Sequence, residues 1–154
     1  MIRASTKLGQ SLTLLVPGTL DGLAEALRVA QAFCDELDAP GLARANVMTA
    51  LDEVLANIVH HGLRDSTGTI ELTMGRDERQ VVAHVADTAA PFDPLLMPPP
   101  DTTLPMERRK IGGLGIALVR ALTDEVAYDR REGRNHLTLT WRLGAEPSKD
   151  GNAD

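Results

Sequence analysis

Two polar side chains that could act together stand four residues apart, Glu53 and Asn57. On an α-helix this spacing places them on the same side, one turn apart. The neighbouring stripe is apolar and consists of Val47, Leu51, Val54 and Ile58. A carboxylate and a carboxamide at the edge of a core can face a ligand held between helix and sheet. The alternative is a solvated helix edge, because polar pairs at this spacing are common on helix surfaces.

Two later segments have residue types suited to the same ligand. Asp87 follows a predicted strand and opens a turn that continues to Pro94, and Gly112-Gly113-Leu114-Gly115 opens a predicted helix. Glycines at a helix start let backbone N–H groups approach phosphate oxygens, and the helix dipole favours the negative charge. We therefore expect Gly113 and Gly115 to line phosphates. The alternatives are a tight loop-to-helix turn for the glycines and a turn or cap role for Asp87.

In order and spacing, the three segments resemble the GHKL ATPase superfamily, whose ATP site uses an N box, an Asp-x-Gly box and a second glycine box with a lid between them. The runs Pro91-Phe92-Asp93-Pro94 and Gly112 to Ile116 look most like the anti-sigma factor serine/threonine kinases of bacterial partner-switching systems. The resemblance covers residues 11–143 and is fairly specific only as a set of motifs. It implies a Bergerat ATP-binding fold with ATP and Mg²⁺ as cofactors.

The resemblance also implies roles for single residues. Asn57 resembles the magnesium ligand, and an amide oxygen suits this hard cation. Glu53 resembles the general base that takes the proton of the attacking hydroxyl. Asp87 resembles the carboxylate that accepts a hydrogen bond from the adenine amino group. The second glycine box places Gly113, Leu114 and Gly115 at the phosphates.

Three further residues are assigned to the nucleotide site. Arg109 is a candidate contact for the terminal phosphate, because phosphoryl transfer gains from a cation on the equatorial oxygens; the alternative is a solvated charge run. Asn135, at the head of the last strand, is predicted to touch the adenine region. Ala89 stands where the family usually has glycine, and its methyl can crowd adenine while alanine resists positive φ. We therefore expect the replacement of glycine by Ala89 to affect the affinity for the nucleotide.

Composition narrows the class of protein. The chain has 154 residues and a formal net charge of −6, which fits one domain and argues against a general nucleic-acid binder. Cys34 lies at a helical core spacing and is interpreted as a small buried apolar residue. Without an apolar run of membrane-spanning length or a signal peptide at the start, the chain is predicted to be cytoplasmic. The four histidines do not suggest zinc, since His60 and His61 are adjacent and His84 and His136 are on separate strands.

Apolar periodicity predicts the elements that position these residues. The predicted helices are 20–37, 42–61 with Gly62 as C-terminal cap, and 112–123. The predicted strands are 11–16, at or near a sheet edge, 69–74, 80–86, 126–129 and 135–143. A proline-rich lid is predicted between Asp87 and Ile111. The order gives an α+β fold: a two-layer sandwich with a mostly antiparallel sheet and three helices on one face. Residues 1–144 are predicted to form one domain and residues 145–154 a disordered tail.

The function that follows is an ATP- and Mg²⁺-dependent protein serine/threonine kinase. By resemblance, its substrate is a small STAS-type antagonist protein, and its captive target is a sigma factor or another output protein. A second copy of the chain is a further candidate partner. The alternative is a binding module that sequesters a partner with weak or no phosphoryl transfer. A histidine-kinase catalytic module uses the same boxes but would need a partner chain to supply the phosphorylated histidine.

Overall fold

The computed structural model describes residues 2–6, 10–63, 68–96 and 113–144. Arg109, most of the predicted lid and the predicted tail lie outside these ranges. The elements, in chain order, are β1 (Ile2–Thr6), β2 (Gln10–Pro17), α1 (Leu20–Glu36), α2 (Arg44–Asn57), η1 (Ile58–Gly62), β3 (Thr69–Arg76), β4 (Gln80–Asp87), η2 (Pro94–Leu96), α3 (Gly113–Leu122), β5 (Glu125–Arg131) and β6 (Arg134–Arg142).

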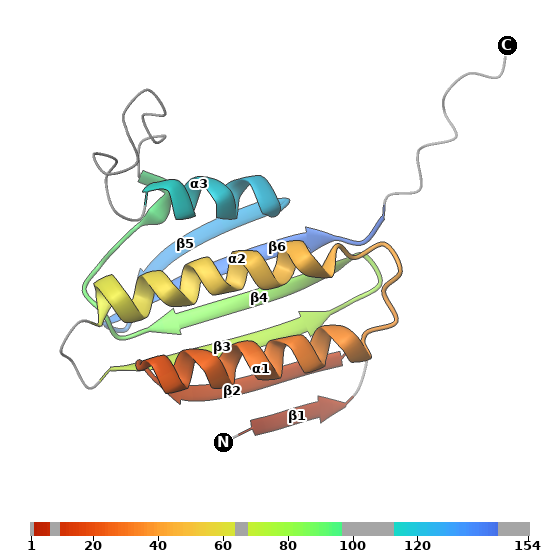
Figure 1. Cartoon of the computed structure of the whole chain (residues 1–154), viewed down its shortest axis with the longest axis horizontal. Helices are drawn as coiled ribbons and strands as arrows, with labels where there is room; N and C mark the ends of the chain where they lie inside the picture. The colour runs from red at the N-terminus through yellow and green to blue at the C-terminus, as the bar shows by residue number, and fades with distance from the viewer. Residues whose placement is uncertain (1, 7–9, 64–67, 97–112, 145–154) are drawn as a thin grey trace, which may run out of the picture.

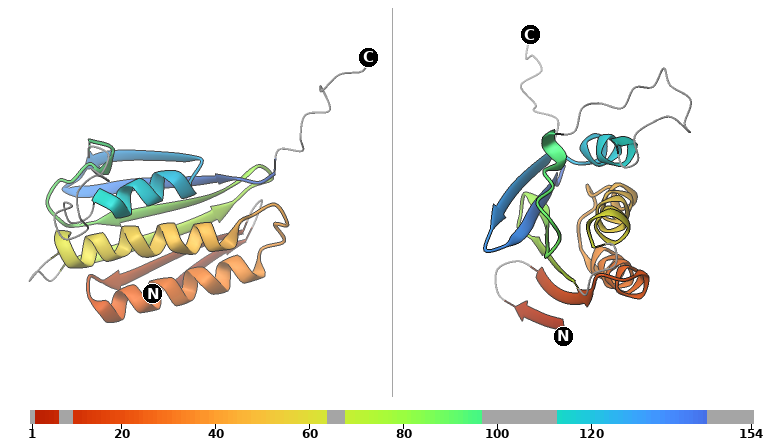
Figure 2. Two further views of the ribbon diagram at one scale, coloured as in Figure 1. Left: turned by 45° about the horizontal axis from the view of Figure 1, so that its top comes forward. Right: turned by 90° about the vertical axis from the view of Figure 1, so that its left-hand side faces the viewer.

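The strands form one six-stranded sheet in the order β1-β2-β3-β4-β6-β5 (Figure 1), and every neighbouring pair is antiparallel. The three helices cover a single face of this sheet (Figure 2). The predicted α+β sandwich is therefore confirmed. Within the described ranges, no helix is both long and apolar enough to cross a membrane.

The sequence did not reveal β1. This strand pairs with β2, which also pairs with β3 and is therefore second from the sheet edge. The sequence Ile2-Arg3-Ala4-Ser5-Thr6 has a single large apolar side chain, so it lacks the alternation that signals a half-buried strand.

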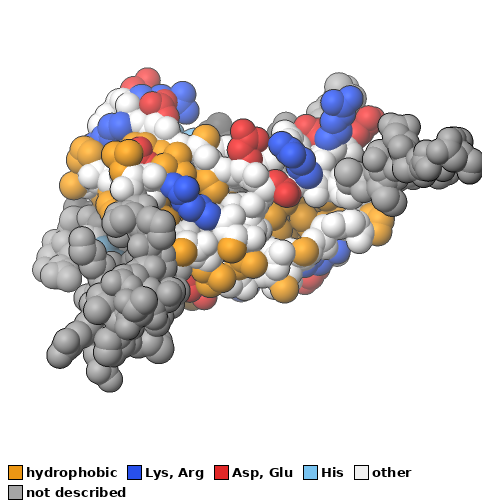
Figure 3. Space-filling view, turned by 90° about the horizontal axis from the view of Figure 1, so that it is seen from above, with side chains coloured by type: hydrophobic (Ala, Val, Ile, Leu, Met, Phe, Trp, Pro, Cys, Tyr) orange, Lys and Arg blue, Asp and Glu red, His pale blue; other side chains and the backbone are white. Residues whose placement is uncertain are grey.

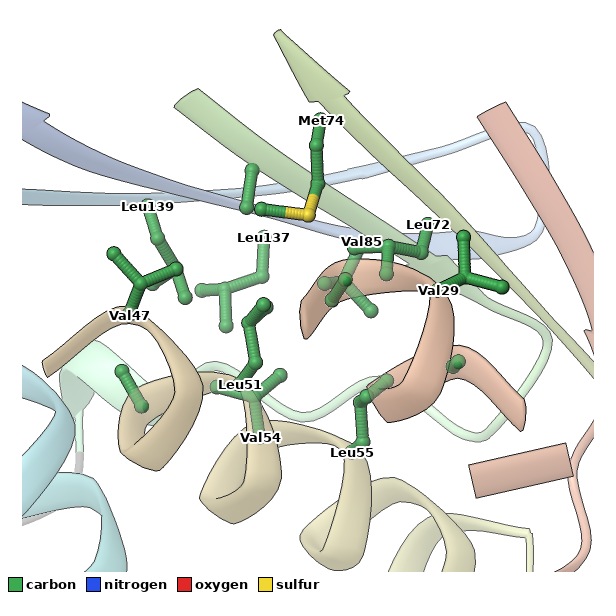
Figure 4. Packing of buried hydrophobic residues seen from close by; sticks show 14 of the residues in the cluster. Val29, Val47, Leu51, Val54, Leu55, Leu72, Met74, Val85, Leu137 and Leu139 are labelled. Atoms are coloured by element: carbon green, nitrogen blue, oxygen red, sulfur yellow. The ribbon is translucent and has the colours of Figure 1, made fainter. Parts of the chain in front are cut away.

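The core lies between α2 and the centre of the sheet. Figure 4 shows Val47, Leu51, Val54 and Leu55 of α2 directed toward side chains of β3, β4 and β6. Leu51 and Leu55 are fully buried, and Ile58 is partly buried against the same cluster. The predicted apolar stripe of this helix is thus the face that packs on the sheet, and it leaves the side bearing Glu53 and Asn57 at the edge of the core.

Helix α1 was predicted with nearly correct bounds but with a partly wrong buried face. Its N-cap is Thr19, whose hydroxyl accepts from the Gly22 N–H, and its buried residues are Gly22, Ala26, Val29, Ala30 and Cys34. Leu20 is exposed, although its apolar spacing predicts a buried row of Leu20, Leu23, Leu27, Ala30, Cys34 and Leu37. A Cβ on Gly22 would lie only 1.9 Å from the Pro17 carbonyl oxygen. Small side chains let the helix approach the chain closely here, so the leucines flank the contact instead of filling it.

The end of the central helix also differs from the prediction. The α-helix stops at Asn57, and Ile58–Gly62 form a π-helical turn in which the Leu63 N–H donates to the Ile58 carbonyl at 2.7 Å. Gly62 is the last residue of this turn, and Leu63 with φ −106° is its cap. The prediction that Gly62 caps an α-helix is therefore wrong. Single π-turns recur at functional sites.

The last hairpin is longer than predicted. Strands β5 and β6 pair up to Arg131 and Arg134, which leaves a two-residue turn of Glu132 and Gly133. Both turn residues have positive φ, 53° and 73°, as a tight hairpin turn requires. Tyr128 and Asn135 are consequently positioned within a regular two-stranded ladder.

Candidate functional site

A pocket of about 300 Å³ opens between the end of α2, the start of α3 and the ends of β4 and β6. Its volume is at the lower end of the range for small-molecule sites. Asn57, Asp87, Ala89 and Asn135, four of the residues predicted to bind the nucleotide, line it. The other lining residues are mostly apolar or aromatic: Val54, Ile58, His61, Ala90, Pro91, Phe92, Pro94, Ile116, Tyr128 and Leu137.

Helix α3 begins against the polar edge of α2. A Cβ built on Gly115 would lie 2.6 Å from Oε2 of Glu53 and 3.8 Å from Nδ2 of Asn57. Glycine at position 115 leaves the Glu53 carboxylate in its place, because a methyl group there would displace it. The structure thus brings together the two motifs that the sequence places almost 60 residues apart.

The Asn57 amide has an unpaired end. Its Nδ2 is buried and has no hydrogen-bond partner among the described residues. A buried amide group left unpaired costs about 1–3 kcal/mol, so a ligand that supplies a partner recovers this energy. The nitrogen and oxygen of an amide exchange places by rotation about χ2. The same position can therefore present an oxygen to a cation.

Asp87 is a buried carboxylate at the pocket wall. Its Oδ1 accepts from the Ala89 N–H at 2.9 Å and from Nδ2 of Asn135 at 3.0 Å. The bond to Ala89 is the turn role that was the alternative for Asp87. One carboxylate oxygen of Asp87 thus stabilises the turn, while Asp87 also lines the pocket.

Asn135 is buried directly beside Asp87, since the two residues are register partners on β4 and β6. Its Nδ2 donates to Oδ1 of Asp87 and to the carbonyls of Ala89 and Ala90, at 3.0, 3.4 and 2.9 Å. Its Oδ1 accepts from the Phe92 N–H at 3.2 Å and from the Tyr128 hydroxyl at 2.6 Å. The amide that was predicted to touch adenine is thus engaged by the protein at both ends.

Ala89 adopts an ordinary backbone conformation. Among the described residues other than glycine, only Glu132 has positive φ, so the expected resistance of alanine to positive φ does not arise. The Ala89 carbonyl also accepts from Nη1 of Arg130 at 2.7 Å. The turn after β4 is therefore fixed by side chains rather than by a glycine.

Sequence reasoning missed His61 and Tyr128 as pocket residues. His61 was not assigned to the site, although the sequence places it four residues after Asn57, as Asn57 follows Glu53. That repeat was a signal for a shared side of the helix. Tyr128 is the chain's single tyrosine. Its place two residues after Val126 on a strand indicated the inward face, but nothing in the sequence indicated its hydrogen bond to Asn135.

For the remaining predicted residues, the structure gives the backbone position of Gly113 and Leu114 only. Gly113 and Leu114 are the first two residues of α3, whose opening N–H groups have no partner within the helix. Arg109 is not among the described residues. Phe92, which lines the pocket, is an exposed large apolar side chain, as are Leu96 of η2 and Leu118 of α3, and Figure 3 shows hydrophobic side chains gathered on the face that is seen from above.

A helix edge with a carboxylate and an amide, a glycine start of a second helix and a strand-end aspartate together define a nucleotide-binding class of site. Residues 16–141 match the family of the histidine kinase-like ATPase domain. This chain belongs to that family, and the resemblance to the GHKL superfamily is confirmed.

Named relatives are protein kinases. The serine/threonine-protein kinase BtrW of Bordetella bronchiseptica is 36% identical over 98 residues, which are 63% of this chain and 69% of that protein. The serine-protein kinase RsbW of Bacillus thuringiensis is 29% identical over 107 residues, 67% of each chain. RsbW of Bacillus cereus matches to the same extent.

Proposed function

We propose that this chain is an ATP- and Mg²⁺-dependent protein serine/threonine kinase. One observation carries the proposal: the unpaired buried amide of Asn57 lies beside Glu53, against the glycine start of α3, at the edge of a pocket with a buried carboxylate. The kinase names of BtrW and RsbW support the same activity.

The residues present fit the nucleotide. The purine occupies the largely apolar part of the pocket, where Asp87 receives the exocyclic amino group. The phosphates extend toward the start of α3, whose free N–H groups favour negative charge. The exchangeable amide of Asn57 fits a magnesium ion, which uses oxygen ligands; when bound, the ion neutralises phosphate charge.

Glu53 is the proposed general base. Its carboxylate takes the proton of the substrate serine or threonine hydroxyl as the oxygen forms a bond to the terminal phosphorus. The bond from that phosphorus to the bridging oxygen breaks, and ADP leaves with the electron pair. Gly115 supports this step because it leaves space for the Glu53 carboxylate. A side chain at position 115 would occupy that space. Arg109 stays a proposed contact for the terminal phosphate.

We propose that the protein acts in the cytoplasm and switches between two complexes, one with an antagonist protein and one with a captive target. The proposed substrate is a STAS-type antagonist protein, and the proposed captive target is a sigma factor or another output protein. A second copy of the chain stays a candidate partner. These partners follow from the resemblance to anti-sigma factor kinases, which the relatives' kinase names support.

Incubation with γ-labelled ATP, Mg²⁺ and the antagonist encoded nearest the gene tests the proposal. We expect label on a serine or threonine of the antagonist with the wild-type chain and none with Asn57→Ala. Asp52→Ala is the matched control, because Asp52 is an exposed carboxylate next to Glu53 on the same helix. Capture of the target with no transfer of label by the wild type would instead favour the sequestering module.

A further inference from the structure

Tyr128 and Asn135 form a side-chain relay that ends on the Asp87 carboxylate. The Tyr128 hydroxyl donates to Oδ1 of Asn135 at 2.6 Å, and Nδ2 of Asn135 donates to Oδ1 of Asp87 at 3.0 Å. All three residues line the pocket. The relay therefore connects the edge strand β5 through β6 to the end of β4.

The network fixes the orientation of the Asn135 amide. Two donors, the Tyr128 hydroxyl and the Phe92 N–H, face its oxygen, while three acceptors face its nitrogen. A flipped amide would oppose donors to donors and acceptors to acceptors. Because every polar atom of Asn135 is engaged by protein, this side chain has no free hydrogen-bonding capacity for a ligand.

Only one of the two carboxylate oxygens of Asp87 is hydrogen-bonded by the described residues. Both hydrogen bonds that the described residues donate to this carboxylate end on Oδ1. The second oxygen, Oδ2, accepts none from them, in a residue that lines the pocket. Oδ2 is not one of the fully buried, unpaired side-chain atoms of the described residues, so it stays accessible and can accept from a ligand that brings an N–H group to this place.

We propose that Tyr128 and Asn135 are positioning residues that set the purine selectivity of the site. They hold Oδ1 of Asp87 in the protein and thereby aim Oδ2 at the exocyclic amino group of the base. The inference rests on the proposed function, since it takes the ligand to be a nucleotide. It assigns to Tyr128 a role in choosing the base and none in phosphoryl transfer.

Tyr128→Phe removes one hydroxyl and keeps the ring that lines the pocket. Binding is titrated by calorimetry with ATP and with purine riboside triphosphate, which differs by lacking the 6-amino group. We expect the wild type to prefer ATP by about tenfold or more, the value of one hydrogen bond to a charged group. In Tyr128→Phe, ATP affinity falls severalfold while purine riboside triphosphate affinity is unchanged.

Arg130→Gln is the matched control. Arg130 holds the same turn through the Ala89 carbonyl, but its side chain has no described hydrogen bond to the side chain of Asp87 or Asn135. We expect this variant to change both affinities by the same factor, so that the preference for ATP is kept. Asn135→Ala removes the relay's central link, and its loss of preference should exceed that of Tyr128→Phe.

Three results would overturn the inference. Equal losses for both ligands in Tyr128→Phe would show a merely structural hydroxyl. Unchanged affinities for both ligands in that variant would show that Asp87 is aimed without the relay, and a loss of preference in Arg130→Gln would assign the effect to the whole turn. A wild type that binds neither triphosphate would instead overturn the proposed function, and this inference with it.

Discussion

At the scale of single residues, the site depends on which atoms have been left without a partner. Glu53 and Asn57 form the edge of a packed helix, and their spacing in the sequence was enough to place them on one side of it. Their contact with Gly115 was predicted only through the family resemblance, because periodicity does not report which distant helix approaches. The hydrogen bonds of Asn135 were beyond prediction, since they depend on the register of two strands and the path of a turn.

Replacing Glu53 by glutamine should separate chemistry from binding. Glu53→Gln keeps the size and the contact with α3 but removes the proton acceptor, so single-turnover phosphorylation of the antagonist should fall about 10²- to 10⁴-fold. ATP affinity should stay within about twofold, because no phosphate ligand is lost. Rapid-quench transfer assays beside calorimetric titration measure the two quantities. A variant that transfers phosphate at the wild-type rate would remove Glu53 from the role of base.

Gly115→Ala should damage the site without unfolding the protein. The new methyl would lie 2.6 Å from a Glu53 oxygen, so the Glu53 carboxylate must move from its place. We expect weaker ATP binding and slower transfer with a nearly unchanged midpoint of thermal unfolding. Gly75→Ala is the control, because a Cβ there would meet nothing closer than 3.9 Å. Equal activity of the two variants would contradict the close approach of α3 to Glu53.

At the scale of elements, apolar periodicity predicted α1, α2, α3 and the two central hairpin strands well, since each buries one regular face. It failed where local geometry departs from the ideal helix. The π-turn of Ile58–Gly62 has no composition signal, and it is adjacent to Asn57 and contains the pocket residue His61. The predicted row of α1 combined leucines with Ala30 and Cys34, whereas its buried residues are Gly22, Ala26, Val29, Ala30 and Cys34, because close packing here favours smaller side chains.

Enlarging the small face of α1 should therefore destabilise the fold. Ala26 is fully buried, and Ala26→Leu must force the helix away from the sheet at a cost of about 1–3 kcal/mol. Ala24, two residues earlier on the same helix, is exposed, so Ala24→Leu should change the free energy of unfolding by about 0.5 kcal/mol or less. Urea denaturation of both variants measures the difference. Equal stabilities of the two variants would show that α1 packs on the sheet through its leucines Leu23 and Leu27 and not through Ala26.

At the scale of the whole molecule, the sheet has one face packed by helices, and distant residues meet on the other face. The placement of His84 and His136 on separate strands counted against a zinc site, but β4 and β6 are neighbours. Nδ1 of His136 lies 3.1 Å from Nε2 of His84, and Glu71, Ala86, His136 and Asp129 follow one another across four strands. Strand order, which the sequence does not determine by itself, decides this proximity.

This pair should make stability depend on pH. Burial lowers the pKa of His84 below the ordinary value of 6.5, and the charges of His136, Arg131 and Arg134 lower it further against the opposing effect of Glu71. Because the folded-state pKa is lower, the unfolded chain binds more protons between that value and 6.5. The stabilisation by neutral His84 is therefore complete above the unfolded pKa and is lost as pH falls toward the folded one.

Urea denaturation between about pH 8 and about pH 5 measures this dependence, with the wild type compared to two variants. The free energy of unfolding of the wild type should decrease as pH falls through 6.5, and His84→Gln should flatten the decrease because it removes the group that must take up a proton on unfolding. His60→Gln serves as control, since His60 is exposed on η1, away from the sheet, and it should keep the wild-type slope. If His84→Gln retained that slope as well, the partly buried histidine pair would not be the source of acid sensitivity, and the protons taken up on unfolding would have to come from other groups.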